Sequence, residues 1–354
     1  MKERFKVRED LFTLEVPGGY ADKIEAGVGF LDCSLGTNPF GTSEKVKEKL
    51  KDLDIDLSAY PDVRYTHLRN ALAGYWDIDE ESIFFGAGTI GCFEKVNKFV
   101  ITQGSKVLGI SPQYTRYISD VLAMGGFYKA VPLKKENRFK IDVGEVVNAL
   151  NSDYSLFYLD NPHNPTGQAL KLKEVEEIVQ DAERKGILVL VDEAYGDFIG
   201  KEESAIKLDY DNLIVIRSFS KGFGLASVRV GYAVIKNRNL GELYRKVDLP
   251  FPISRIGEIL AVEALNDKKF LNESRKKIAL IKKKIINALK KEFQIAATHM
   301  QTPIMLLWGS GDIYHYFLQK KILTVRGSVF RPLDDSYVRL RVPEKVEELL
   351  SRLF

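Results

Sequence analysis

Strand-like and helix-like segments alternate through the middle of the chain, and this alternation constrains the fold more than any other feature. Several of the strand-like segments are almost continuously apolar, and they occupy residues 82–85, 106–110, 127–133, 156–160, 187–192, 213–218 and 228–235. Strands of that composition are covered on both faces, as in a parallel sheet between two layers of helices. Between two of them, residues 171–186 carry apolar side chains at helical spacing and end at a glycine. The pattern predicts an α/β fold with a mostly parallel central sheet.

The pattern of predicted helices and strands changes near residue 250. Helices are predicted over residues 255–265, 273–293 and 344–350, with short strands at 305–308 and 337–342. The second of these helices is rich in lysine, but Ile278, Ile281, Ile285 and Leu289 form an apolar stripe along it. A chain of 354 residues exceeds one typical domain. We therefore expect a large domain over residues 41–248 and a smaller α+β domain over residues 249–354.

Charge and cysteine content limit the classes of partner. The formal net charge is +3, from 52 basic and 49 acidic residues, which is too small to predict binding to nucleic acid or to an anionic membrane. No apolar run approaches the roughly 20 residues that span a bilayer, and the first ten residues lack the apolar stretch of a signal peptide. Cys33 and Cys92 are too few for a disulfide framework and lie in no metal-ligand spacing. These features predict a cytoplasmic protein without a metal site.

Lys221 lies directly after a predicted strand, in the stretch Ser218-Phe-Ser220-Lys221-Gly-Phe-Gly. Ligands of α/β sheets bind at the carboxyl ends of the strands, so this lysine is expected at the mouth of the sheet. A lysine amine in that place can form a Schiff base with a cofactor such as pyridoxal 5′-phosphate (PLP). The hydroxyls of Ser218 and Ser220 and the guanidinium of Arg229 can bind a phosphate. By itself the stretch is also compatible with a glycine-rich loop that carries an exposed lysine.

Three polar residues follow the neighbouring strands. Asp192 ends the predicted strand 187–192, and a carboxylate buried there costs free energy unless it pairs with a cation such as the protonated ring nitrogen of PLP. Tyr195 follows three residues later, and Asn164 stands in the turn Asn-Pro-His-Asn164-Pro-Thr-Gly, which the prolines and glycine make rigid. Both can hydrogen-bond the ring oxygen of PLP. Taken singly, each of these residues could be an ordinary surface, turn or core residue. A single cofactor site would explain why all three follow neighbouring strands.

Two further segments complete the predicted cofactor site. Gly-Ala-Gly88-Thr89-Ile90 follows a predicted strand and begins a helix, where the backbone N–H groups of Gly88, Thr89 and Ile90 can bind an anion. A Gly-x-Gly alone is equally compatible with a nucleotide-binding fold. Tyr114 follows another predicted strand, where its ring can stack on the pyridine ring, although an ordinary packed aromatic is the simpler explanation for it alone.

With these motifs in place, the chain resembles the fold-type I PLP enzymes of the class I and II aminotransferase group. The likeness is strongest to the branch of histidinol-phosphate aminotransferases and threonine-phosphate decarboxylases, and it covers nearly the whole chain. The resemblance implies the three-layer fold of aspartate aminotransferase, with an N-terminal segment, residues 1–40, packed against the smaller domain and the cleft. It implies that Lys221 carries PLP as a Schiff base and shuttles protons, that Asp192 pairs with the ring nitrogen, and that Asn164 and Tyr195 hold the ring oxygen.

The resemblance also assigns the remaining contacts. Tyr114 would stack on the ring, while Gly88, Thr89, Ile90, Ser218, Ser220 and Arg229 would hold the cofactor phosphate. Asn38, in Leu-Gly-Thr-Asn38-Pro-Phe-Gly, would line the substrate cleft. Arg339, in Tyr-Val-Arg339-Leu-Arg, would bind the substrate carboxylate, although the residues alone favour a charge on the surface of a strand. Tyr60 would reach the PLP phosphate of a partner subunit, which implies a homodimer with composite active sites.

Three functions remain compatible with these residues. The first is an aminotransferase that moves an amino group between an amino acid or amino-phosphate compound and a 2-oxo acid. The second is a PLP-dependent decarboxylase of the threonine-phosphate type, since the bond that breaks depends on substrate geometry, which no motif states. The third is a cofactor-binding regulator, which the lack of a helix-turn-helix segment disfavours. Arg326, Arg331 and Arg341 offer charge for a substrate phosphate or second carboxylate, or are solvated surface arginines.

Overall fold

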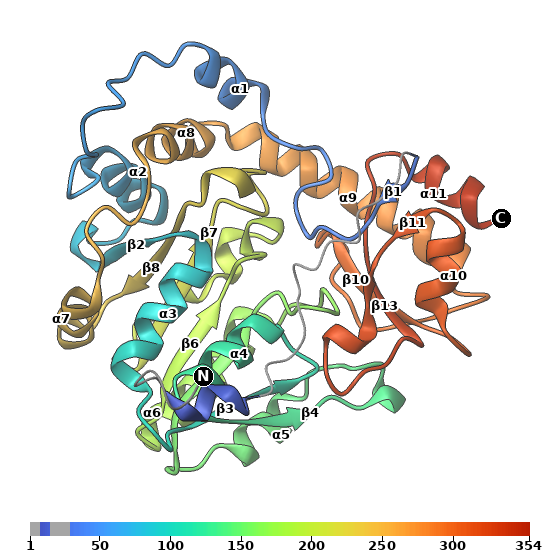
Figure 1. The fold of residues 1–354 in the computed structure, drawn as a ribbon, viewed down its shortest axis with the longest axis horizontal. Coiled ribbons are helices and arrows are strands. Elements are labelled where there is room, and N and C mark those ends of the chain that lie inside the picture. The colour runs from blue at the N-terminus through green and yellow to red at the C-terminus, as the bar shows by residue number, and fades with distance from the viewer. Residues whose placement is uncertain (1–7, 15–28) are drawn as a thin grey trace.

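The computed structural model describes residues 8–14 and 29–354 (Figure 1). Residues 1–7 and 15–28 lie outside the described residues. They include much of the predicted N-terminal segment, residues 1–40, and most of the first ten residues that lack a signal-peptide pattern. Residues Glu9–Phe12 form one turn of 3-10 helix.

The predicted central sheet is present and has seven strands in the order β2-β8-β7-β6-β5-β3-β4. Five neighbouring strands, β7, β6, β5, β3 and β4, run parallel, whereas β8 is antiparallel to both β7 and β2. The bounds are β2 Ile83–Gly86, β3 Lys106–Ser111, β4 Phe127–Pro132, β5 Tyr154–Asp160, β6 Leu188–Asp192, β7 Leu213–Ser218 and β8 Gly231–Ile235. The mostly parallel sheet expected from the apolar segments is confirmed.

One predicted strand begins later than expected. Residues 228–230 do not join the sheet, because Ala226–Val228 form a 3-10 helix and Arg229 adopts a left-handed conformation with φ of 56°. The guanidinium of Arg229 turns back and donates to the carbonyls of Ala226 and Ala87, each at 3.0 Å. β8 therefore starts only at Gly231.

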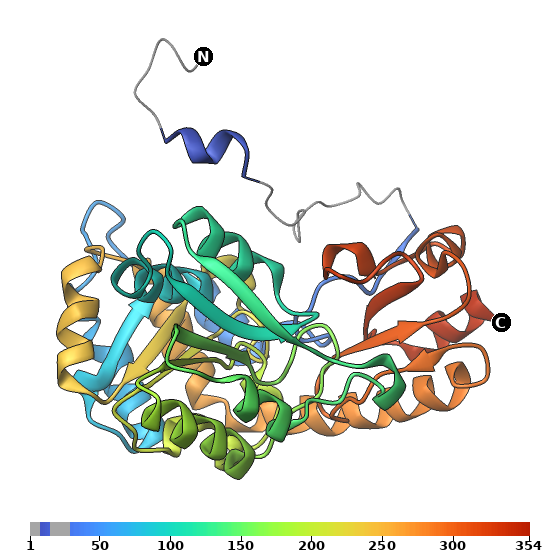
Figure 2. The ribbon, with the colours of Figure 1, turned by 90° about the horizontal axis from the view of Figure 1, so that it is seen from below.

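Helices cover both faces of the sheet, which gives three layers (Figures 1 and 2). On one face the strands pack against α3 (Gly88–Val100), α4 (Thr115–Ala123) and α7 (Arg238–Val247). On the other they pack against α2 (Thr66–Trp76), α5 (Val143–Ala149), α6 (Leu172–Arg184) and α8 (Arg255–Asn266), and α1 (Glu44–Lys51) lies on α8. The alternation along β5 shows why: Phe157 and Leu159 belong to the second core, Leu156 and Tyr158 to the first.

A second, smaller unit of sheet and helices stands at one end of the molecule, at the right of Figures 1 and 2. Its antiparallel sheet has the order β12-β13-β10-β9. The strands are β9 Gln294–Ile295, β10 Ile304–Trp308, β12 Val325–Arg326 and β13 Tyr337–Arg341, and the helices are α9 Lys268–Leu289, α10 Ile313–Gln319 and α11 Val346–Leu353. β1 (Leu31–Asp32) pairs with β11 (Ile322–Leu323), so the chain before residue 33 contacts this unit. The domain boundaries at residues 40 and 248 stay predictions, and α8 packs on the core of the large sheet.

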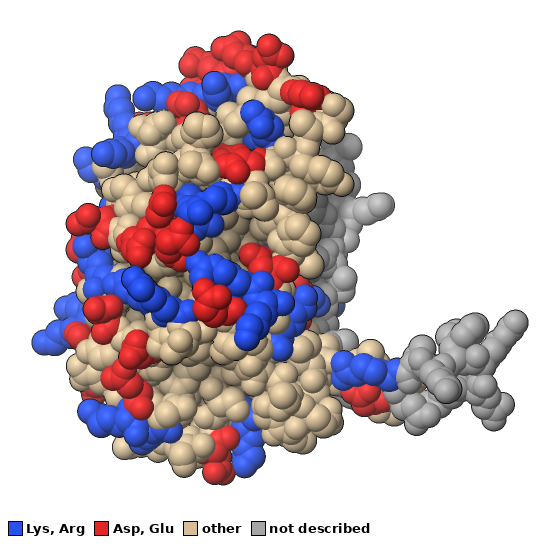
Figure 3. All heavy atoms as spheres, turned by 90° about the vertical axis from the view of Figure 1, so that its left-hand side faces the viewer, with Lys and Arg blue, Asp and Glu red and all other residues tan. Residues whose placement is uncertain are grey.

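The distribution of surface charge and the lengths of the helices are relevant to which partners the protein can bind. On the face that lies at the left of Figure 1, where α7 is exposed, basic and acidic side chains are interspersed (Figure 3). In the part of the chain that the structure describes, no helix combines the length and the apolar character of a membrane span.

Candidate active site

A pocket with about 380 Å³ of empty space opens at the carboxyl ends of β5, β6 and β7. Ten residues line it: Thr89, Tyr114, Tyr158, Asp160, Pro162, Asn164, Asp192, Ala194, Tyr195 and Lys221. Six of them come from the residues that the sequence singled out. Because parallel strands end at one edge, residues from distant parts of the chain meet there.

Asp192 is the last residue of β6 and is only 3% exposed. Its carboxylate accepts hydrogen bonds from the Tyr158 hydroxyl at 3.0 Å and from the Ala194 backbone N–H at 2.9 Å. The pKa of Asp192 is raised to about 7, chiefly by burial and also by the nearby Asp160 carboxyl, while the hydrogen bonds from Ala194 and Tyr158 and the charge of Lys221 oppose the shift. A buried carboxyl in this state binds a cation favourably, since the cation stabilises its charged form.

Asp160 is a second buried carboxyl of the pocket that sequence reasoning missed. It ends β5 and pairs in register with Asp192 on β6. Burial raises its pKa to about 7 as well. Its two oxygens accept from the Asn164 backbone N–H and from the Gln113 side chain, each at 2.9 Å, so it fixes the Asn164 turn and the loop before Tyr114 together. The position of Asp160 at the end of a predicted strand could have marked it as a candidate site residue. Its partners became known only from the register of the strands in the structure.

Arg339, on β13 of the smaller unit, contacts Asn164, one of the residues that line the pocket. It is 1% exposed, so the expectation of a surface charge drawn from the residues alone is wrong. Its guanidinium donates to the Asn164 side-chain oxygen at 3.0 Å and to the Ser34 carbonyl at 2.5 Å. Because the amide oxygen of Asn164 accepts from Arg339, the amide nitrogen is the atom that Asn164 can present to an acceptor in the pocket.

A cluster of donors lies at the start of α3. The Arg229 guanidinium donates to the Ser220 hydroxyl at 3.1 Å, and the Ser218 hydroxyl donates to the same oxygen at 2.9 Å. Gly88 begins α3 with φ of +73°, and a methyl group added there would lie 2.5 Å from Arg229 Nη2. The helix N-terminus, two hydroxyls and a guanidinium thus surround a place that only glycine leaves open, which suits an anion.

The glycines at the start of α3 could also belong to a dinucleotide-binding turn, but the topology of the sheet excludes this interpretation. Gly86, Gly88 and Gly91 follow the spacing of a dinucleotide-binding turn. That turn follows a central parallel strand, whereas β2 is an edge strand and is antiparallel to β8.

Lys221 follows β7, and its Nζ lies 5.6 Å from the centre of the Tyr195 ring. The Tyr195 hydroxyl lies close to the backbone of Gly36, since a methyl group there would lie 1.8 Å from it. Sequence reasoning did not single out Gly36, although it stands two residues before Asn38 in a segment that was singled out.

Asn38 does not line this pocket. Its backbone N–H donates to the Lys221 carbonyl at 3.0 Å, and its side-chain amide donates to the Gly222 carbonyl at 2.8 Å and the Ser274 hydroxyl at 3.0 Å. The side chain therefore holds the loop that carries Lys221 against α9. Its predicted contact with substrate stays a prediction.

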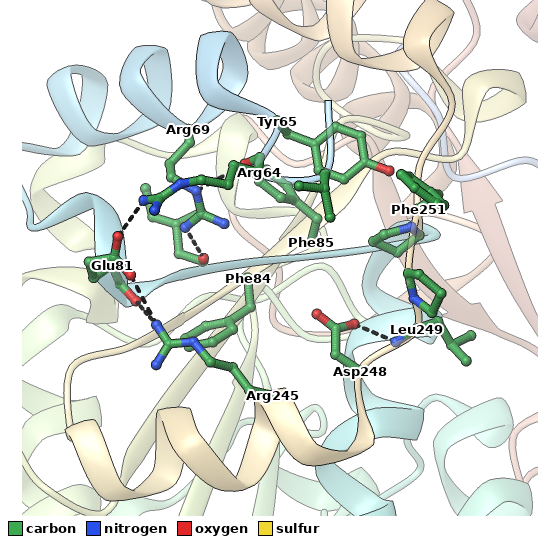
Figure 4. A pocket seen from close by; sticks show the side chains of 14 residues that line it. Arg64, Tyr65, Arg69, Glu81, Phe84, Phe85, Arg245, Asp248, Leu249 and Phe251 are labelled. Atoms are coloured by element: carbon green, nitrogen blue, oxygen red, sulfur yellow. Dashed lines mark hydrogen bonds and ion pairs between the residues drawn. The ribbon is translucent and has the colours of Figure 1, made fainter. Parts of the chain in front are cut away.

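Tyr60 also lies away from the pocket of its own chain. It is 77% exposed and stacks on Phe251, with ring centres 4.6 Å apart. Phe251 lines a second, larger pocket with about 920 Å³ of empty space, shown in Figure 4. There Glu81 joins Arg64, at 2.5 Å, to Arg245, at 3.1 Å, across the cavity from Phe251.

Comparison with known proteins identifies the family. The profile of the family described as aminotransferase class I and II matches residues 29–353. The chain belongs to the class I and II aminotransferases. It is 28% identical over 363 residues to the histidinol-phosphate aminotransferase of Bacillus cytotoxicus, a match that covers 98% of this chain and 96% of the relative.

Solved structures share the fold of this aminotransferase. A histidinol-phosphate aminotransferase from Sinorhizobium meliloti, in complex with pyridoxal-5′-phosphate, matches with a TM-score of 0.83 and 24% identity, over 99% of this chain and 96% of that chain. An L-threonine-O-3-phosphate decarboxylase from Porphyromonas gingivalis matches with a TM-score of 0.76 and 22% identity, over 90% of this chain and 98% of that one. The resemblance and the three-layer fold expected from the sequence are confirmed.

Membership of this aminotransferase family implies PLP as the cofactor, and the pocket residues fit that group. The amine of Lys221 and the buried carboxyl of Asp192 line the same pocket. The cluster of hydrogen-bond donors at the start of α3, the helix that carries Thr89, suits a phosphate. The amine suits the aldehyde of PLP, the carboxyl suits its ring nitrogen, and the donor cluster suits its phosphate. Among the described residues, no cluster of histidine, cysteine or acidic side chains is arranged to hold a metal ion.

Proposed function

We propose that this aminotransferase binds PLP at Lys221 and moves the amino group of a phosphorylated amine, of the histidinol phosphate type, to a 2-oxo acid. The observation that carries the substrate class is the similarity to histidinol-phosphate aminotransferases over nearly the full length of both chains. The pocket supports the reaction class, because a lysine, a buried carboxyl and a buried arginine meet at one edge of the sheet.

Each pocket residue has a proposed task. When bound, PLP supplies an aldehyde that takes up the amino group and a ring that accepts electrons. The Asp192 carboxylate stabilises a proton on the ring nitrogen, and the Asn164 amide and Tyr195 hydroxyl donate to the ring oxygen. The Lys221 amine would accept and return the proton at the reacting carbon.

The cofactor phosphate is assigned to the donor cluster at the start of α3. The proposed contacts come from the backbone N–H groups of the helix start and from three side chains: Gly88, Thr89, Ile90, Ser218, Ser220 and Arg229. Tyr114 lines the pocket and is proposed to stack on the ring.

Two arginines are proposed to recognise substrate. Arg339, held by Asn164 and the Ser34 carbonyl, is placed to bind the carboxylate of the 2-oxo acid. The carbonyl of Arg331 accepts from the Ser111 hydroxyl at 3.2 Å, so Arg331 lies beside the loop that carries Tyr114 and is our candidate for the substrate phosphate. Arg326 pairs with Asp335 at 2.5 Å, and Arg341 donates to the Asp32 carbonyl, so both have other tasks.

We also propose a cytoplasmic homodimer with composite active sites. Large apolar side chains are exposed at the second cavity: Val63, at 68%, and Leu249, at 57%, line it, and Tyr60, at 77%, stacks on its Phe251. Apolar side chains in such numbers favour burial against another protein surface. Tyr60 would reach the cofactor phosphate of the partner subunit from this face.

A single-turnover reaction tests the proposed function. Protein loaded with PLP is mixed with histidinol phosphate, and with histidinol as the matched compound without phosphate. We expect the visible absorbance of bound PLP to be lost as pyridoxamine phosphate and a carbonyl product form, at least about tenfold faster with the phosphorylated amine. Release of carbon dioxide from phosphothreonine, with the PLP spectrum restored in each cycle, would instead support the decarboxylase.

A further inference from the structure

Lys282, on α9, is a fully buried lysine that the proposed reaction does not use. Its side chain is 0% exposed, although it stands in a lysine-rich helix whose other lysines mostly face solvent. Within residues 8–14 and 29–354 no acidic side chain pairs with it, and burial lowers its pKa well below the ordinary value. Instead, Nζ is surrounded by oxygens: Thr298 Oγ1 at 2.6 Å, His299 O at 2.8 Å, Thr302 O at 2.9 Å, Thr302 Oγ1 at 3.1 Å and Ile304 O at 2.8 Å.

Burial favours the neutral amine, whereas the five oxygens around the nitrogen favour the ammonium form and oppose that shift. An ammonium group has three N–H donors and no acceptor, whereas a neutral amine has fewer donors and a lone pair that would face these oxygens. Three of the five are backbone carbonyls, the ligands that proteins use to replace the hydration shell of a potassium ion. The shell around Nζ therefore has the make-up of a site for a monovalent cation.

The loop that supplies these oxygens, residues 298–304, is bound to the Asn164 turn. The His299 backbone N–H and the Thr302 hydroxyl both donate to the Gly167 carbonyl, at 2.9 and 2.6 Å. Gly167 in turn donates to the His163 carbonyl at 2.7 Å, which closes the turn that contains Asn164.

The same loop leads directly into the strand beside Arg339. Ile304 begins β10, and Leu306 on β10 pairs in register with Arg339 on β13. Lys282 thus contacts the loop that links Arg339 of the smaller unit to Asn164 of the large sheet. These two residues share a hydrogen bond.

We propose that Lys282 is a positioning residue whose ammonium group takes the place of a bound monovalent cation, and that it holds Asn164 and Arg339 in register through the loop 298–304. The proposal rests on the proposed function for the roles of those two residues in catalysis, but the cation-like role of Lys282 stands on geometry alone. Losing the ammonium group removes the donor that these five oxygens share and leaves only the hydroxyls of Thr298 and Thr302 to donate to the three buried carbonyls, which destabilises the loop more than the loss of packing does.

The first experiment reads stability, and it needs no activity. Thermal unfolding of Lys282→Ala is measured in potassium, ammonium and choline chloride at equal ionic strength. We expect the variant to unfold at a lower temperature than wild type in choline, and to regain part of the difference only in potassium or ammonium. Lys283→Ala, which alters the exposed neighbour on the same helix, should show no salt-specific change. An identical unfolding temperature of Lys282→Ala in all three salts would overturn the cation-like role.

The second experiment reads the active site. Lys282→Met keeps most of the side-chain volume without the charge, so we expect KM for the 2-oxo acid to rise about tenfold, the effect of losing one charged hydrogen-bonding group. Affinity for PLP should fall by a smaller factor than KM rises, because Asn164 is the cofactor contact linked to Lys282 and the donor cluster at α3 is not. Unchanged KM, or equal losses in KM and PLP affinity, would contradict the proposal.

If Lys282→Met does not fold, Thr302→Val tests the same link, because it removes a hydroxyl shared by Lys282 and Gly167. It should raise KM for the 2-oxo acid in the same way, and an unchanged KM would count against the proposal. A wild-type protein that fails to transaminate would refute the proposed function, and the salt experiment would still decide the role of Lys282.

Discussion

Two carboxyl groups at neighbouring strand ends are the most unusual feature of the site at the scale of single residues. Asp160 and Asp192 are register partners at the ends of β5 and β6, and burial raises the pKa of each to about 7. A raised pKa in the folded state means that the folded protein binds a proton that the unfolded chain releases. The stability that this provides is present below the unfolded pKa near 4 and is lost as pH rises through about 7.

We therefore predict that Asp192→Asn stabilises the cofactor-free protein at pH 8 and has little effect at pH 4. The expected gain is on the order of 1 kcal/mol per unit of pKa shift removed. The measurement is urea unfolding of cofactor-free protein from pH 4 to 8. Asp209→Asn, at an aspartate whose side chain is 90% exposed, serves as control and should follow wild type at every pH. A constant difference between Asp192→Asn and wild type across this range would contradict the prediction.

At the scale of elements, the junction of β2 and α3 decides where a phosphate can bind. Gly88 starts the helix in a conformation that other residues rarely adopt, and the Arg229 guanidinium lies where a side chain of residue 88 would be. Arg229 also adopts a left-handed conformation, which costs about 1–2 kcal/mol for a residue with a side chain. Strain of this kind persists where the surrounding contacts hold it, and here two carbonyls and Ser220 do so.

Gly88→Ala is predicted to lower the affinity for PLP by roughly tenfold or more, because the methyl group would displace Arg229 and strain the helix start. Equilibrium titration of cofactor-free protein with PLP, followed by absorbance, measures this. Gly74→Ala is the matched control, since a methyl group there meets no atom within 4 Å and α2 gains helix propensity. Equal PLP affinities for the two variants would mean that the phosphate binds elsewhere.

At the scale of the whole molecule, the site depends on contacts between parts that are distant in the chain. Arg339 of the smaller unit holds Asn164, which lines the pocket of the large sheet, and Asn38 ties the Lys221 loop to α9. Tyr60 faces outward, on a surface with several exposed apolar side chains. A complete site in our proposal therefore needs both units and a second subunit.

Mixing two defective variants tests the composite site. Tyr60→Ala keeps its own Lys221, and Lys221→Ala keeps the tyrosine that its partner needs, so a mixed dimer contains one native site. After subunit exchange we expect about a quarter of wild-type activity from random pairing of equal amounts. Mixing Lys221→Ala with Lys221→Met should give no gain. An active monomer in sedimentation would refute the dimer.

The sequence by itself determined the large sheet and most of the residues around its pocket. Continuous apolar segments bounded by turns can be satisfied only by buried strands, and the polar residues that follow such strands must collect at one edge. Lys221, Asp192, Asn164 and Tyr195 were found in this way, because each signal lies within a few residues of its strand. The family resemblance added Arg339, which periodicity alone placed on the surface.

Only the tertiary structure decided which partners these residues have. Asp160, Gly36 and Lys282 acquire their roles from atoms elsewhere in the chain. The helical spacing of Ile278, Lys282 and Ile285 places this lysine on the buried face of α9, but not the oxygens that surround it. Asn38 stands in a segment that suggests substrate contact, yet its amide is used to hold the loop after Lys221. The reason is physical: local sequence sets which backbone forms are favourable, whereas the burial and pairing of a polar side chain depend on what the fold places beside it.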